Sequence, residues 1–124
     1  MNARALFGVA AIFNAVVGVA MLLTYGALAP WLGLPPQPTV WVHLVALIVL
    51  VFGYAYWRVA QDPRRFREYI VLGMVAKLCF VAVIYGHFLA GDATAMLAAL
   101  VTADLVFAGL FGAHLKRTPT DGRR

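Results

Sequence analysis

Two ionisable residues lie inside otherwise uncharged, apolar segments of this sequence. Lys77 is the only Lys, Arg, Asp or Glu between Tyr69 and Gly91, and Asp104 is the only one between residues 93 and 115. An ionisable side chain inside a membrane segment is costly and usually faces a partner, a cavity or an ion pathway. These two residues could therefore form a buried ion pair, or a site that binds a proton or a small ligand.

The depths of the two residues in their predicted helices nearly coincide. Measured from the same end, Lys77 and Asp104 lie about 12 and 15 Å along helices that rise 1.5 Å per residue. The short segment 91–93 between these helices predicts an antiparallel hairpin, which brings the two levels side by side. Asn14 lies about 14 Å along the first predicted helix. The sequence therefore predicts a buried polar centre made of Lys77, Asp104 and Asn14.

Three interpretations of Lys77 and Asp104 stay open at the level of sequence. They could be a structural pair, a proton or ligand site, or two residues that face different directions. Lys77 has a long stem that could reach part of the way to the membrane surface, whereas Asp104 is too short to do so. A central Asp costs a membrane helix about 3 kcal/mol, which favours a partner for Asp104.

The composition identifies the elements that must position these residues. The chain has 124 residues, of which 64% are hydrophobic and only 12% are charged, and a soluble domain of this size could not bury so much apolar surface. No charged residue occurs between Ala5 and Trp57, a length that accommodates two membrane spans and a Pro-rich turn. We predict an all-α membrane protein, a bundle of four transmembrane helices that forms one domain over residues 1–124. The helices are expected at about 5–28, 40–60, 69–90 and 94–114.

Proline and small residues bear on the boundaries of the first helix. The motif Ala27-Leu28-Ala29 resembles a signal-peptide cleavage site, but the apolar run before it is too long for a signal peptide. We therefore expect this segment to stay as a membrane helix. Segment 30–38 contains four prolines, and because proline lacks an N–H and clashes with the preceding turn, this segment is not expected to continue the helix.

Basic residues predict the orientation of the helices. Of the ten Lys and Arg residues, all except Lys77 lie before the first helix, around the 58–67 turn, or after the fourth helix. Short loops rich in Lys and Arg are retained in the cytoplasm, so both termini are expected there. The net charge of +5 has the same origin, and we attribute it to orientation and contact with anionic lipids. A nucleic-acid partner is not expected.

Small residues indicate which helix faces turn inward. Membrane helices associate closely where small side chains let their backbones approach. Gly73 lies one turn before Lys77, and two stripes with four-residue spacing each contain a polar residue. The stripes are Ala10, Asn14 and Gly18, and Asp104, Ala108 and Gly112.

Other kinds of chemistry have less support in the sequence. His43 and His87 are both expected near the outer surface, at one level, as two axial haem ligands would be. Interfacial histidines that bond to loops or water are far commoner, so no cofactor is expected and haem is the exception to be considered. Cys79 is a lone cysteine in mid-helix, and no spaced cluster of metal ligands or catalytic carboxylates is present. No metal site is therefore predicted, and an enzyme is the less favoured class without being excluded.

Several features of this chain are shared with a known group: its small size, its four predicted spans, and the residues Arg4, Phe13-Asn14, Gly18 and the Gly73 that precedes Lys77. In these features the chain resembles the DoxX-like group of small bacterial membrane proteins. The resemblance extends over the chain at the level of architecture and implies no particular activity. Small multidrug resistance transporters also have four helices, but they carry an essential Glu in the first helix. Here that helix has Asn14, and the membrane acid is Asp104 in the fourth.

These observations favour a multi-pass protein of the bacterial inner membrane with an accessory, structural or small-ligand-binding role that is not enzymatic. The alternative is a small proton-coupled transporter that works through Asp104. Because four helices enclose little space, transport would require an oligomer. The expected partners are the lipid bilayer and either further copies of this chain or another membrane protein.

Overall fold

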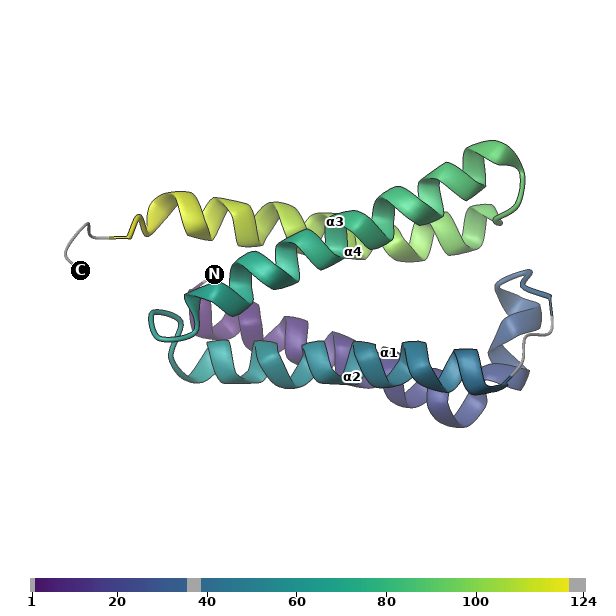
Figure 1. Cartoon of the computed structure of the whole chain (residues 1–124), viewed down its shortest axis with the longest axis horizontal. Helices are drawn as coiled ribbons and strands as arrows, with labels where there is room; N and C mark the ends of the chain where they lie inside the picture. The colour runs from purple at the N-terminus through teal and green to yellow at the C-terminus, as the bar shows by residue number, and fades with distance from the viewer. Residues whose placement is uncertain (1, 36–38, 121–124) are drawn as a thin grey trace.

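The computed structural model of the chain describes residues 2–35 and 39–120. Within these residues the chain is all helical. It forms α1 (Ala3–Trp31), α2 (Thr39–Gln61), α3 (Arg67–Ala90) and α4 (Ala95–Arg117) (Figure 1). Each of these helices is long and apolar enough to cross a membrane. The prediction of an all-α protein with four long apolar helices is therefore confirmed.

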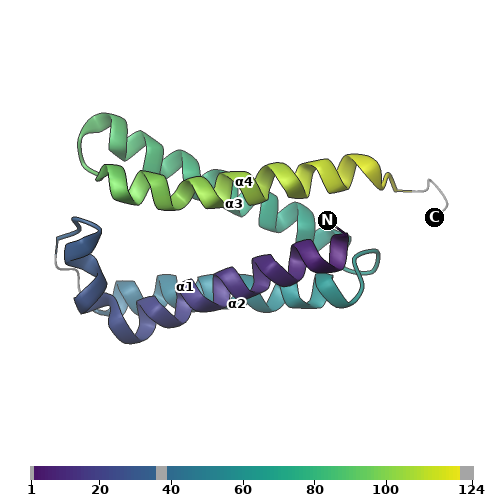
Figure 2. The same ribbon diagram turned by 180° about the vertical axis from the view of Figure 1, so that it is seen from behind.

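The helices form two antiparallel hairpins, α1 with α2 and α3 with α4 (Figures 1 and 2). The N-terminus, the α2–α3 turn and the end of α4 lie at one end of the molecule, which we call the basic end because Arg4, Arg64 and Arg117 lie there. The turns within the two hairpins lie at the other end. Each helix of a hairpin packs along its neighbour in sequence, whereas α2 and α3, although joined by the short turn 62–66, contact each other much less.

The end of α1 differs from the prediction, because the helix continues through Pro30 to Trp31. The backbone leaves helical geometry earlier, at Thr24 (φ −130°, ψ 17°), whose hydroxyl donates to the carbonyl of Ala20 at 2.6 Å. Pro30 thus lies in a short helical segment beyond this kink. Because proline has no N–H, this segment lacks one backbone hydrogen bond. The helix ends at Trp31 and is followed by a Schellman turn, in which Gly33 has a φ of 65° and the N–H of Leu34 bonds to the Ala29 carbonyl.

The turn between α3 and α4 is equally well defined. Gly91 has a φ of 87°, and the N–H of Asp92 bonds to the His87 carbonyl at 2.8 Å, which closes a second Schellman turn. Thr94 then caps α4 by accepting from the Leu97 N–H at 3.2 Å. The Thr94 hydroxyl also donates to the Leu32 carbonyl at 2.5 Å, so it joins the end of one hairpin to the other.

We expect Thr94→Val to destabilise the protein by about 1–2 kcal/mol, because it removes both a helix cap and a bond between the hairpins. Amide hydrogen exchange at Leu97, measured in nanodiscs, should accelerate along with the loss of stability. Thr94→Ser is the matched control, since it keeps the hydroxyl, and it should behave like the wild type. Equal exchange in all three proteins would show that the hydroxyl contributes nothing.

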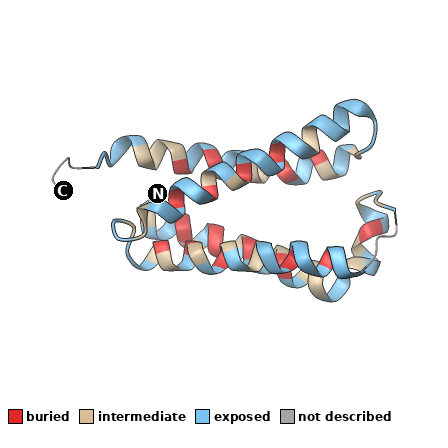
Figure 3. Cartoon of the chain, viewed as in Figure 1, coloured by how far each residue is buried: buried red, intermediate tan, exposed pale blue. Residues whose placement is uncertain are grey.

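The apolar core lies mainly toward the basic end, where the two hairpins meet. Phe7, Tyr56, Ile70 and Phe111, one from each helix, are 0–1% exposed there. Away from this contact many helix residues are exposed, as the pale blue parts of the ribbon in Figure 3 show, and many of these exposed residues are large and apolar. Ile12, Leu23, Val51 and Leu89, for instance, are at least 65% exposed. Such extensive apolar exposure is expected of helices that are solvated by lipid.

Candidate functional site: a polar centre between the hairpins

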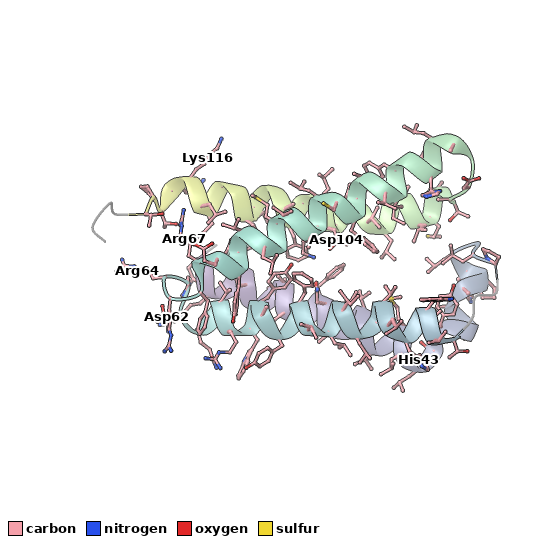
Figure 4. All side chains as sticks on the ribbon, in the orientation of Figure 1. His43, Asp62, Arg64, Arg67, Asp104 and Lys116 are labelled. Atoms are coloured by element: carbon pink, nitrogen blue, oxygen red, sulfur yellow. The ribbon has the colours of Figure 1, made fainter. Side chains whose placement is uncertain are left out.

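Lys77 lies buried between the two hairpins and is only 5% exposed. Its ammonium forms an ion pair with the carboxylate of Asp104 on α4. It also donates to Asn14 Oδ1 on α1, with 3.3 Å between Nζ and the oxygen. The structure thus brings Lys77, Asp104 and Asn14 into one cluster, which we call the polar centre. Figure 4 labels Asp104, which lies near the middle of the molecule's long axis on the side of its hairpin that faces the other hairpin.

Asn14 extends the polar centre to α2. Its side-chain amide donates to the Val49 carbonyl at 3.2 Å, while its oxygen accepts from Lys77. A Cβ placed on Gly53 would lie 3.3 Å from Asn14 Cβ, so this glycine allows α2 to approach closely. One continuous series of polar contacts therefore runs from α4 through α3 and α1 to α2.

Aromatic rings surround the remaining side of the ammonium. Lys77 Nζ lies 5.7 Å from the ring centre of Phe13 and 5.4 Å from those of Tyr56 and Phe107. Rings within about 6 Å attract a cation through their quadrupole, and the attraction is stronger where water is absent. The charge of Lys77 is therefore stabilised by a carboxylate, an amide oxygen and three rings.

Gly73 determines how closely Tyr56 approaches the polar centre. A Cβ added to Gly73 would lie 2.5 Å from Tyr56 Cε1 and 2.7 Å from its hydroxyl oxygen. Tyr56 is 1% exposed, and its ring packs on Phe111 with 5.2 Å between ring centres. Only a residue without a side chain at position 73 lets α3 accept this ring one turn before Lys77.

Asp104 is the most accessible member of the polar centre. Its side chain is 17% exposed, compared with 6% for that of Lys77. Lys77 contacts Oδ1 of Asp104, and within the described residues no hydrogen bond engages Oδ2. The cluster can therefore hold a buried charge pair, and it also presents one carboxylate oxygen to a further proton or cation.

The two small-residue stripes lie largely inside. Ala10 and Asn14 are buried, and Gly18 packs so closely on α2 that a Cβ there would lie 2.6 Å from Leu50 Cγ. In α4, Ala108 is 3% exposed and Gly112 is half-buried. The polar residue of each stripe thus lies on the face that its helix turns toward the neighbouring helices.

The two histidines considered as haem ligands are both exposed. His43 lines a hollow made by α1, α2 and the segment between them, and His87 contacts Asp92 of its own turn at 3.4 Å. In the described parts of the chain no hydrogen bond or ion pair links the two rings. Among these residues no group of His, Cys, Asp and Glu could hold a metal ion. Haem binding stays an untested prediction.

Sequence reasoning missed the aromatic side of the polar centre and the role of the Val49 carbonyl. Phe13 precedes Asn14, and Phe107 lies one turn after Asp104, so their helix faces could have indicated two of the rings. No comparable sequence pattern indicated the position of Tyr56. Gly73, which lies opposite its ring in the structure, was the one hint of a close approach. A backbone carbonyl that accepts from a side chain has no signal in the sequence.

Searches of protein-family models, of curated proteins and of solved structures found no match to this chain.

Proposed function

We propose that this chain is an integral protein of the bacterial inner membrane with an accessory, structural or small-ligand-binding role, and that its polar centre holds two helical hairpins together. One observation carries the proposal, namely the continuous series of polar contacts through Asp104, Lys77, Asn14 and the Val49 carbonyl. Inside a bilayer, lipid chains are as apolar as leucine, so packing and polar contacts must join the hairpins. Within the polar centre, the bond from Lys77 to Asn14 crosses from one hairpin to the other. The Lys77–Asp104 pair, which joins α3 to α4, orients the ammonium for that bond.

The experiment that tests the structural role is a double-mutant cycle on Lys77→Met and Asp104→Leu in lipid nanodiscs. Strong coupling, with the double variant recovering stability, supports a structural pair. Additive effects, together with release of protons from Asp104 when cationic compounds are added, would contradict it.

The orientation that we propose has both termini and the α2–α3 turn in the cytoplasm, as supported by the arginines at the basic end. Single cysteines at Gln61 and Asp92, introduced in a Cys79→Ala background, test it. We expect a membrane-impermeant maleimide to label Asp92→Cys in intact spheroplasts, and to label Gln61→Cys only after permeabilisation. The opposite pattern would reverse the proposed topology.

The second candidate function is proton-coupled transport by an oligomer, working through Asp104. The 17% exposed side chain of Asp104, whose Oδ2 makes no hydrogen bond within the described residues, and the three rings around the ammonium favour it. A carboxylate with aromatic faces is a suitable environment for an organic cation. In this alternative the Lys77 ammonium occupies the position that such a cation would take. A purely monomeric protein in native-like lipid would count against transport.

A relationship to the DoxX-like group is part of the same proposal and is supported by the four-helix architecture alone. The partners that we propose are the lipid bilayer and either further copies of the chain or another membrane protein. The exposed apolar faces of the helices are suited to either.

A further inference from the structure

A second polar feature lies at the basic end, separate from the polar centre. It is a pocket of about 910 Å³ between the start of α1, the α2–α3 turn and the end of α4. The residues that line it include Arg4, Arg64, Arg67 and Arg117, together with His114 and one acidic residue, Asp62. We call it the basic pocket. Figure 4 shows Arg64, Arg67 and Asp62 at this end, with Lys116 on the other side of α4.

The four arginines of the basic pocket have no acidic partner in the described residues. The ion pairs of the described residues join Lys77 to Asp104 and His87 to Asp92, and both lie outside the pocket. Asp62 Oδ1 instead accepts from the backbone N–H of Arg65 at 3.1 Å. Four positive charges around one hollow repel one another, and an anion from outside the chain would relieve that repulsion.

Arg67 is held in place at the wall of the pocket by neutral groups. Its guanidinium donates to the Thr118 carbonyl at 2.5 Å and to the Leu115 carbonyl at 3.2 Å, which ties the start of α3 to the end of α4. These bonds orient the guanidinium without neutralising it. A positioned guanidinium with other arginines beside it suits the oxygens of a phosphate group, which it can bind through two parallel bonds.

We propose that the basic pocket binds the phosphate headgroup of an anionic phospholipid, an inference that rests on the proposed membrane location. The pocket lies at the ends of the apolar helices, where headgroups are found, and basic pockets between membrane helices suit such headgroups. Leu110 on α4 is 42% exposed. It lies about two turns before Arg117 on the same face of the helix, so exposed apolar surface for an acyl chain adjoins the pocket.

Native mass spectrometry of the full chain in detergent tests this proposal, with dioctanoyl phosphatidylglycerol, dioctanoyl phosphatidylcholine and inorganic phosphate as probes. The wild type should retain the anionic lipid in preference to the zwitterionic one. Arg4→Gln and Arg117→Gln should each weaken this binding about fivefold, since one basic residue near the headgroup contributes on that scale. Neither side chain makes a hydrogen bond within the described residues, so both variants are expected to fold.

Arg65→Gln and Lys116→Gln are the matched controls, because they remove the same charge at the same end without lining the pocket. They should bind the lipid within about twofold of the wild type. An equal loss in pocket and control variants, or equal retention of the two lipids, would overturn the proposal. Inorganic phosphate that bound as tightly as the anionic lipid would instead identify a site for a soluble anion. The readout does not depend on the topology or on the role of Lys77, so its failure is distinct from failure of the proposed function.

Discussion

Asp104→Leu alone is expected to destabilise the protein by about 3–5 kcal/mol, because it leaves the Lys77 ammonium buried without its counter-charge. Asn14 and the three rings stay near the ammonium, but none of them carries a negative charge. Lys77→Met should also destabilise, since it strands the Asp104 carboxylate. Reversible unfolding in nanodiscs would measure both losses.

The double variant Lys77→Met/Asp104→Leu should recover most of this loss, since apolar side chains of similar volume then fill the space. Recovery should be incomplete, because Asn14 Oδ1 loses its donor, which costs about 1–3 kcal/mol. Leu105→Val changes an exposed neighbour of Asp104 and should stay within about 0.5 kcal/mol of the wild type. A stable Asp104→Leu variant would show that the stability of the polar centre does not depend on the charge pair.

Gly73→Ala is expected to destabilise by about 1–3 kcal/mol, because the added methyl group would overlap the ring of Tyr56. The ring has little room to retreat, since it is 1% exposed and packs on Phe111. Because α3 must move outward to accept the methyl group, Lys77 one turn later should also lose contact with its partners. Thermal unfolding in lipid, compared with the wild type, would measure the effect.

Gly86→Ala provides the matched control for this prediction, because it makes the same change on the same helix with nothing within 4 Å of the added Cβ. It should leave stability unchanged or slightly higher. A second variant, Gly73→Ala/Tyr56→Leu, should cost less than the two single changes together, since the smaller side chain removes the overlap. Equal stability of the Gly73 and Gly86 variants would show that the close approach is not required.

The sequence predicted how far along their helices the residues of the candidate site lie, but it did not predict all of their contacts. A constant rise per residue and a short turn were sufficient to place Lys77 and Asp104 at one level. Rotation about the helix axis decides which side chains then meet, and small errors in helix boundaries and crossing angles change it. The bond from Asn14 to the Val49 carbonyl, and the rings of Tyr56 and Phe107, therefore became visible only in the structure.

The first helix shows the same limit for backbone geometry. Prolines in segment 30–38 indicated an end before Pro30, yet α1 continues to Trp31. Proline weakens a helix locally, whereas the position of its end was decided by the kink at Thr24, the turn at Gly33 and the bond from Thr94 to Leu32. The last of these depends on a residue far along the chain, so a local pattern could not reveal it.

The sequence by itself determined that this is a protein of four long apolar helices joined by short turns, because the length and apolarity of each segment are local properties. It also determined which two charges had to be accommodated among them. The tertiary structure decided how they are accommodated. Gly73 lets the two hairpins approach, Gly53 lets α2 approach α1, Asn14 links the charge pair to α2, and four arginines line one pocket. Those outcomes depend on helix rotation and on contacts between distant residues, which no single segment specifies.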